Sequence, residues 1–409
     1  MAASKLARVL AAGMGLAGLA TALPARAHPY ADYHIIESHT EIRAHHLTRT
    51  SSTVQVGTDP INRFQMVHVA RNAHAHRGTL LLLPPISSGF ENYEVGDDGD
   101  YTKSFAGFFA RRGYDVWGLS QRTENLAPGT CESGAVDCSA MANWGLQTLL
   151  DDAGFVRAQI TAFRPWERPV VGGVSLGSIA GAALIDAHPF AYAGAILLEG
   201  AIYDEDPDHR AITAGFCDLF EDQLAAGIHY DGKQLGGMKL LASLATIDPD
   251  GPSPVPGFPA GFTNHQAFVG AMTNPGVSPL TPWPGYYFLE GNAATDSFVS
   301  ANDALARANI ATFTDYVALR TLRDVDCGLA GERTFTSRLH RFHGPVFVNA
   351  GGHGFGPAML DTIGLMTHAQ VTLNYVEPFG HMDHFFAEDH QALMEEPILA
   401  WLEDEVFGG

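Results

Sequence analysis

The stretch Pro169-Val-Val-Gly-Gly-Val-Ser-Leu-Gly-Ser-Ile-Ala-Gly181 decides the fold. A β-branched run predicts a short strand, and the Ala-, Gly-, Ile- and Leu-rich run after Ser175 predicts a helix that extends to Asp186. Ser175 lies between Gly173 and Gly177, so the pattern G-x-S-x-G falls on the turn between strand and helix. We expect a turn so tight that Ser175 takes a strained backbone conformation, with small neighbours because the two backbones nearly touch.

Such a turn presents its serine as a nucleophile. The hydroxyl would stand free at the carboxyl end of a strand, and the N-terminal dipole of the following helix favours a developing oxyanion. The alternative interpretation is an ordinary strand-to-helix turn with a solvent-facing serine. The position of Ser175 between a β run and a helix favours the nucleophile.

Strands and helices alternate on both sides of this turn. Further strands are predicted at 79–84, 114–119, 191–198, 344–349 and 370–376, and further helices at 104–112, 144–163, 358–367 and near the C-terminus. Short connections between them predict an α/β fold with a mostly parallel central sheet and helices on both faces. Sites in such sheets lie at the carboxyl ends of the strands, where Ser175, Ile86, Gln121 and Glu199 fall.

The N-terminal part of the core has a different pattern. Alternating apolar residues over 52–69 predict two antiparallel strands joined at Gly57-Thr-Asp-Pro60. Residues 28–50 hold five histidines without metal-ligand spacing. We expect this segment to be an irregular, solvated arm.

From about residue 201 to 339 the alternation stops. Acidic turns, helix-like pieces at 214–225, 236–246 and 312–322, and Pro- and Gly-rich aromatic stretches occupy this segment. We therefore divide the chain into a signal peptide (1–27), an α/β core (28–200 and 340–409) and an inserted cap or lid (201–339). The aromatic residues of the cap either line a substrate pocket or form a small core of its own.

The first 27 residues predict a cleavable signal peptide. Lys5 and Arg8 precede an apolar run over 9–23, and Ala25-Arg26-Ala27 fits the small-x-small cleavage pattern. The apolar run is too short for a stable membrane span, and no other apolar stretch of about 18 residues occurs. We expect a mature protein that is secreted or periplasmic.

The net charge limits the possible partners of the protein, and the cysteine content predicts disulfides. The formal net charge of −21 argues against nucleic acid and anionic membrane surfaces as partners. An even number of cysteines in an exported chain predicts disulfides. The short spacing of Cys131 and Cys138 favours a local bridge, which leaves Cys217–Cys327 as a second bridge across the middle segment. The alternative is four free thiols.

Two phrases in the core resemble the α/β-hydrolase superfamily, in particular its serine esterases and lipases. They are Gly113-Tyr-Asp-Val-Trp-Gly-Leu119 followed by Gln121-Arg122, and Gly380-His381-Met382-Asp383 after the last predicted strand. Together with the G-x-S-x-G turn after the fifth predicted strand, they extend the resemblance over roughly 75–200 and 340–405. The cap has no counterpart in the resemblance.

The resemblance implies the roles of several residues. Ser175 is the nucleophile, and His381 is the general base that takes its proton and later returns it to the leaving group. His384, one helical turn further on, is the weaker alternative for the base. The backbone N–H groups of Leu176 and of Ile86 or Ser87 would form the oxyanion hole.

The acid of the triad is where this chain departs from the family pattern. The family usually places Asp after the strand that here ends at Asn349, but the loop 350–357 holds His353 and no acid. A known variant position, after the preceding core strand, is occupied by Glu199. We rank Glu199 first, ahead of Asp361 and Asp204. Gln121 and Arg122 either contact a polar substrate group or, as we favour for Arg122, form a structural ion pair.

These observations predict a secreted serine hydrolase that cleaves carboxylic esters through an acyl-enzyme intermediate and needs no cofactor or metal. Its substrate would be a small-molecule ester with an apolar acyl or aromatic group. A peptidase or amidase on the same triad is an alternative. So is a non-catalytic binding protein on the same fold. A metal-dependent hydrolase is a weaker alternative, because Phe379-x-His381-x-Asp383-His384 matches three of four positions of an H-x-H-x-D-H zinc motif.

Overall fold

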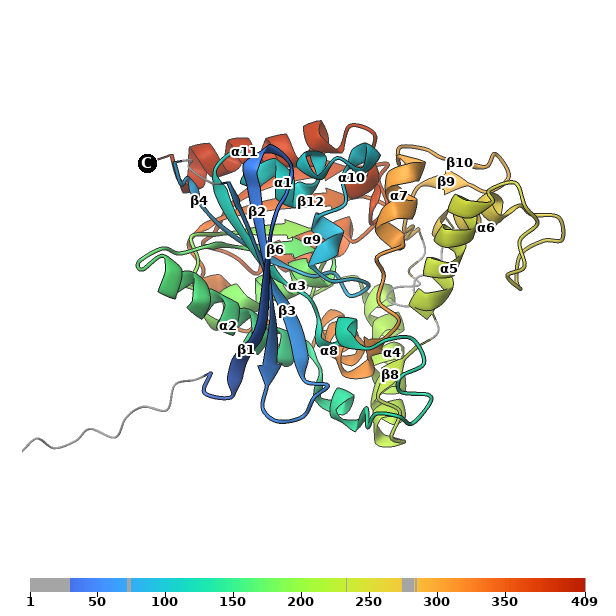
Figure 1. Cartoon of the computed structure of the whole chain (residues 1–409), viewed down its shortest axis with the longest axis horizontal. Helices are drawn as coiled ribbons and strands as arrows, with labels where there is room; N and C mark the ends of the chain where they lie inside the picture. Colours follow the sequence, from blue (N-terminus) through green and yellow to red (C-terminus); the bar gives the residue numbers. More distant parts are fainter. Residues whose placement is uncertain (1–29, 72–74, 233, 274–282, 284, 409) are drawn as a thin grey trace, which may run out of the picture. The chain divides into compact units, whose positions relative to one another are not determined.

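A nine-stranded sheet runs through the residues that the structure, a computed structural model, describes: 30–71, 75–232, 234–273, 283 and 285–408. Residues 32–409 belong to one compact unit. The strand order is β1-β2-β3-β5-β4-β6-β7-β12-β13 (Figure 1). The strands are β1 Tyr33–Ile42, β2 Leu47–Val56, β3 Arg63–Arg71, β4 Gly78–Leu83, β5 Tyr114–Leu119, β6 Val170–Val174, β7 Gly194–Leu198, β12 Pro345–Gly351 and β13 Gln370–Val376. The predicted signal peptide lies outside the described residues.

The sheet is parallel wherever the sequence alternates between strand and helix. Neighbouring strands from β5 to β13 pair in parallel, whereas β1, β2, β3 and β5 pair antiparallel. All residues of β4, β6 and β7 are buried, as expected for strands covered on both faces. The mostly parallel α/β sheet predicted from the sequence is confirmed.

Helices cover both faces of this sheet. In Figure 1, α1 and α11 lie on one side, and α2 and α3 lie on the other. The helices of this part are α1 Phe105–Ala110, α2 Leu146–Phe163, α3 Leu176–Ala187, α9 Gly356–Gly364, α10 Asp383–Phe386 and α11 Glu396–Trp401. Within the described ranges, none of the helices has the length and apolar character that a membrane crossing needs.

The prediction of an irregular arm over 28–50 is wrong. Residues 33–42 form β1, which pairs along β2 with one irregularity after Ile35. Hydroxyl contacts support the pairing, with Ser38 Oγ 2.8 Å from Ser52 Oγ. Nearly every residue of β1 is exposed, so this edge strand lacks the apolar alternation that reveals a half-buried strand. The serine turn consequently follows the sixth strand, not the fifth.

Residues 201–339 form a group of helices and short strand pairs beside the sheet (Figure 1). They comprise α4 Pro207–Ala225, α5 Gln234–Ile247, α6 Asn264–Thr273, α7 Asp303–Ile310 and α8 Leu319–Leu329, with β8 Tyr230–Asp231 paired to β11 Val317–Ala318 and β9 Gly291–Asn292 paired to β10 Ser297–Phe298. The helix predicted over 312–322 is wrong in its first half, where Thr314 Oγ1 accepts from the N–H of Tyr316 and breaks the helical pattern. That this segment is a cap stays a prediction.

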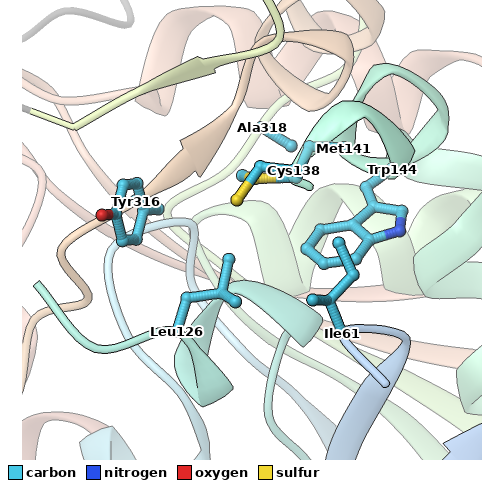
Figure 2. Close-up of a cluster of buried hydrophobic side chains, with 7 residues drawn as sticks. All are labelled: Ile61, Leu126, Cys138, Met141, Trp144, Tyr316 and Ala318. Carbon is cyan, nitrogen blue, oxygen red and sulfur yellow. The ribbon is translucent and has the colours of Figure 1, made fainter. Parts of the chain in front are cut away.

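One disulfide lies within this segment, and a buried cluster beside the other disulfide packs the segment against the core. Cys131–Cys138 and Cys217–Cys327 are bonded as predicted, and the second bridge joins α4 to α8. Figure 2 shows Tyr316 and Ala318 of the middle segment packed with core residues, among them Cys138 of the first bridge. The cluster consists of Ile61, Leu126, Cys138, Met141, Trp144, Tyr316 and Ala318. Disulfides of this kind are typical of an oxidising compartment.

Candidate active site

Ser175 occupies the strained turn that the sequence predicts. Its backbone angles are φ 57° and ψ −120°, outside the usual range for a residue with a side chain. The N–H of Ser175 donates to the carbonyl of Leu198 at 2.8 Å, which sets the turn directly beside the end of β7. Ser175 then begins α3 as its N-cap residue.

The glycines of the G-x-S-x-G pattern are required by close approach. A Cβ on Gly173 would lie 2.4 Å from the carbonyl oxygen of Leu83, and a Cβ on Gly177 would lie 2.2 Å from the same atom. The same Cβ on Gly173 would lie 3.3 Å from the Cα of Gly177. The strand and helix therefore approach each other as predicted, but the closest obstacle is the end of the neighbouring strand β4.

Glu199 follows β7 and faces inward. It has a positive φ of 45°, and it is 1% exposed. One carboxylate oxygen accepts from the N–H of Gly351, and the other accepts from the N–H of Phe355 at 2.9 Å. Burial raises the pKa of Glu199, while His381 and these two N–H groups act in the opposite direction. The donors fix the carboxylate in one orientation.

His381 lies against this carboxylate. Its Nδ1 is 3.3 Å from Oε2 of Glu199, and both side chains are almost fully buried. The backbone N–H of His381 donates to the carbonyl of Tyr287 at 2.8 Å. A proton on Nδ1 shared with Glu199 leaves Nε2 with a free lone pair, which is the tautomer a general base needs.

Aromatic rings surround the imidazole of His381. The ring centroids of Phe355, Phe288 and Tyr286 lie 5.1, 5.7 and 5.9 Å from that of His381. Tyr286 and Phe288 come from the segment that the sequence assigns to the cap, whereas Phe355 comes from the loop after β12. These rings exclude water from one side of the histidine.

The two predicted oxyanion positions lie at the start of α3 and in the loop after β4. Leu176 is the first residue of α3, and the first N–H groups of a helix have no acceptor inside the helix. Ile86 belongs to the loop after β4. Nε2 of Gln121 donates to the carbonyls of Pro85 at 2.7 Å and Ile86 at 3.0 Å. The carbonyl oxygens of this loop are thereby held by a side chain of the adjacent strand end.

Comparison with known proteins identifies the fold. No family model matches the sequence, and no curated protein matches it. A proposed lipase from Sulfolobus solfataricus has a similar structure, with a TM-score of 0.62 and 21% identity over 91% of this chain and 99% of that chain. A highly thermostable carboxyl esterase from Bacillus coagulans gives a TM-score of 0.53 and 13% identity over 88% and 99%. The protein has the α/β-hydrolase fold.

The two other carboxylates considered for the triad have different partners. A carboxylate oxygen of Asp361 accepts from the N–H of Glu205 at 2.7 Å. Asp204 lies 3.1 Å from Nδ1 of His209. Among the acids weighed from the sequence, Glu199 is the one that the structure brings to His381.

Asp383 and His384, the other polar residues of the G-H-x-D-H phrase, contact groups other than Glu199. Asp383 accepts from the N–H groups of Gly380 at 2.7 Å and Glu290 at 3.0 Å. His384 packs against Phe379, and burial lowers the pKa of His384 to about 4. His381, Asp383 and His384 thus face three different sets of partners and do not converge on one point.

Arg122 and Gln121 also have partners within the protein. Arg122 forms two hydrogen bonds to Asp152, at 2.9 and 2.7 Å, which agrees with the structural ion pair that we favoured. Gln121 holds the loop after β4, a role that the sequence analysis missed. The sequence marked Gln121 by its place at a strand end alone. Tyr93, which contacts both β4 and β6, carried no signal in the sequence.

Proposed function

We propose that this protein is a secreted serine hydrolase that cleaves carboxylic esters with a triad of Ser175, His381 and Glu199. The observation that carries the proposal is the contact between Glu199 and His381, made directly beside the strained serine turn. A serine hydroxyl is a poor nucleophile at neutral pH, and a histidine in the correct tautomer activates it. A buried carboxylate on Nδ1 supplies that tautomer.

The reaction follows from these roles. Nε2 of His381 accepts the proton of Ser175 as Oγ bonds to the ester carbonyl carbon. The N–H groups of Leu176 and Ile86 would stabilise the oxyanion, with Ser87 as the alternative to Ile86. The C–O bond to the alcohol breaks, the alcohol takes the proton from His381, and an acyl-enzyme remains. Water, deprotonated by His381, then bonds to the acyl carbon, the bond from that carbon to Oγ breaks, and His381 returns the proton to Oγ, which releases the acid and restores Ser175.

An apolar acyl or aromatic ester suits the surroundings of His381. The nearest groups around its ring include Phe288 and Phe355, and the rings of Tyr286 and Trp283 continue this apolar wall. Apolar walls with a few placed polar groups are usual in sites for small molecules. The segment 201–339, which contributes three of these rings, would act as the cap of the site.

Secretion is proposed from the sequence of residues 1–27 together with the disulfides. Both bridges need an oxidising compartment to persist. Arrival in the periplasm or outside the cell would satisfy this requirement. Mass spectrometry of the mature N-terminus tests it, and cleavage after Ala27 is the expected result.

The test of the activity uses a fluorophosphonate, which forms a covalent adduct with an activated serine. We expect wild-type protein to be labelled at Ser175 and to hydrolyse p-nitrophenyl acetate and butyrate. Ser175→Ala should lose labelling and turnover. His381→Ala and Glu199→Gln should lower kcat by about 10³- to 10⁴-fold. Losses of this size follow in other triads when the histidine is removed or its correct tautomer is no longer favoured. Labelling and turnover retained in Ser175→Ala would contradict the proposal.

The same experiment separates the alternatives. A labelled protein that cleaves p-nitroanilides faster than esters would be an amidase or peptidase on this triad. Turnover abolished by EDTA in an unlabelled protein would favour a metal-dependent hydrolase. An unlabelled protein without turnover would favour a binding protein on the hydrolase fold.

A further inference from the structure

The hydroxyl of Tyr93 bridges the two strands that carry the proposed chemistry. It donates to the carbonyl of Leu83, the last residue of β4, at 2.6 Å. It accepts from the N–H of Val174, the residue before Ser175, at 2.9 Å. Tyr93 is completely buried, and burial raises the pKa of its phenol. The hydroxyl therefore stays protonated and can donate and accept at once.

This bridge lies at the last paired residues of the two strands. Strands β4 and β6 pair in parallel as far as Leu83 and Gly173. At this end of the pairing the Tyr93 hydroxyl bonds both the carbonyl of Leu83 and the N–H of Val174. One oxygen atom therefore connects the two strands at the point where the serine turn and the oxyanion loop begin.

The glycines around Ser175 leave space for this hydroxyl. A Cβ on Gly173 would lie 2.4 Å from the Tyr93 oxygen, and a Cβ on Gly177 would lie 3.3 Å from it. Both contacts are shorter than ordinary van der Waals separation. The G-x-S-x-G pattern accommodates the bridge as well as the turn.

Tyr93 also contacts the part of the chain that carries His381. It ends the short helix η2 (Phe90–Tyr93) after the oxyanion loop, and its ring centroid lies 6.0 Å from that of Phe385 in α10. Its neighbour Asn92 exchanges two hydrogen bonds with Asn309 of α7. One side chain is therefore in contact with the strand before the nucleophile, the strand before the oxyanion loop and the helix after the histidine.

We infer that Tyr93 is a positioning residue, whose hydroxyl sets the distance between Oγ of Ser175 and the N–H groups of the oxyanion hole. The inference rests on the proposed function. A displacement of about 1 Å in an active site costs about 10² in rate. Loss of the hydroxyl should therefore lower kcat by about 10- to 100-fold and leave KM within about threefold of the wild-type value.

The test compares Tyr93→Phe with Tyr316→Phe. Tyr316 is a matched control, because it is equally buried and its hydroxyl also forms two bonds, to Glu132 at 2.6 Å and from the N–H of Cys131 at 3.3 Å. Figure 2 shows its ring in the buried cluster that contains Cys138. We would measure kcat and KM on p-nitrophenyl butyrate, the rate constant of fluorophosphonate labelling and the melting temperature.

Both variants should melt at lower temperature, because each loses a buried hydroxyl with two partners. Only Tyr93→Phe should lose kcat, with a matching loss in the labelling rate constant. A folded Tyr93→Phe protein with wild-type kcat and labelling would overturn the inference, since the hydroxyl would then serve stability alone. Absence of labelling in the wild-type protein would instead contradict the proposed function.

A second substitution keeps the test decisive if Tyr93→Phe does not fold. Replacement of Tyr93 by 4-aminophenylalanine keeps an N–H donor for Leu83 but offers Val174 a much poorer acceptor. We expect a folded protein with kcat and labelling rate below wild type, above those of Tyr93→Phe where both fold, and with KM unchanged. Wild-type kcat and labelling in this variant would also overturn the inference.

Discussion

Backbone strain at the site is concentrated in two residues, Ser175 and Glu199. Both have positive φ values, 57° and 45°, although neither is glycine. Conformations of this kind cost of order 1–3 kcal/mol each, and they persist where the surrounding structure determines them. The hydrogen bond from Ser175 N–H to Leu198 and that from Glu199 N–H to Asn349 hold the two turns in place. The serine and the carboxylate are thus presented from adjacent strand ends by the same device.

A first prediction concerns Gly354, which lies between Glu199 and His381. A Cβ on Gly354 would lie 2.3 Å from Oε2 of Glu199 and 2.9 Å from Cα of His381. Gly354→Ala should therefore separate the carboxylate from the imidazole. We expect kcat for p-nitrophenyl butyrate to fall by about 10²-fold or more, because small displacements at an active site have effects of that size.

Gly364→Ala is the matched control for this substitution. Gly364 is exposed at the end of α9, and a Cβ there would have no atom within 4 Å. We expect wild-type kcat and unchanged or slightly higher stability, since alanine favours helix over glycine. If folded Gly354→Ala retained wild-type kcat, turnover would not depend on the contact between Glu199 and His381.

The residue scale also shows what the sequence could reveal about the site. Ser175 and His381 belong to local patterns whose chemistry is visible in a few consecutive residues. Glu199 had to be chosen among acids, because its partners Gly351 and Phe355 lie more than 150 residues away in the chain. Tyr93 and Gln121 act through backbone groups of other strands, and such contacts depend on tertiary structure alone.

At the scale of elements, the segment 286–290 is fastened to the turn that begins α10. The N–H of Met382 donates to the carbonyl of Phe288 at 2.9 Å, and the N–H of Glu290 donates to Asp383 at 3.0 Å. The carboxylate of Asp383 also accepts from Gly380. Asp383 is therefore the side chain through which the middle segment and the histidine turn share a buried acceptor.

A second prediction follows from the pKa of Asp383, which burial raises to about 7. Because this value lies above that of the unfolded chain, the folded protein binds an extra proton between about pH 4 and pH 7. Asp383 should therefore make stability fall as pH rises through this window and have no further effect above it. Asp383→Asn keeps an oxygen for both N–H groups and removes the titration.

The measurement is the free energy of unfolding in urea at pH 4.5, 6 and 8. We expect Asp383→Asn to gain stability relative to wild type as pH rises, by up to about 1.4 kcal/mol for each unit of the pKa shift. The Asp404→Asn variant is the control, because it removes an exposed carboxylate. If the free energy of unfolding of the wild type instead rose with pH relative to that of Asp383→Asn, the raised pKa of Asp383 would be contradicted.

Element boundaries were predictable where apolar residues recur with a clear period in the sequence. The last strand, Gln370–Val376, has the predicted limits, and α2 begins two residues after its predicted start. Exposed β1 was missed because nothing in its sequence distinguishes an edge strand from a polar arm. Helices α6 and α7 were missed because short helices in a Pro- and Gly-rich segment owe their stability to tertiary packing more than to propensity.

At the scale of the whole molecule, the chain from 201 to 339 leaves the core after β7 and returns to it at β12. A long inserted segment of this kind costs conformational entropy, because its two ends must meet at adjacent strands. The bridge Cys217–Cys327 closes a loop that contains most of residues 201–339, with a sequence separation of 110 residues. The bridge Cys131–Cys138 closes a separation of only 7 residues.

A third prediction compares the removal of the two bridges. By chain entropy, a closed loop of about 100 residues is worth about 4.7 kcal/mol and one of about 8 residues about 2.5 kcal/mol. The Cys217→Ser, Cys327→Ser double variant should therefore lose more stability in urea than the Cys131→Ser, Cys138→Ser double variant. Equal losses, or a larger loss for the short bridge, would show that local packing outweighs loop closure.

The same comparison bears on where the protein folds. Production in a reducing cytosol removes both bridges at once, so the protein should then resemble the quadruple serine variant in stability. Because the long bridge joins α4 to α8, and the segment between them supplies Tyr286 and Phe288 to the surroundings of His381, the proposed ester hydrolysis should be lost at a lower temperature than in the oxidised protein. Activity measured against temperature, with and without reductant, checks this. A reduced protein that keeps the wild-type activity profile would mean that the non-covalent contacts of the middle segment are sufficient to hold the site.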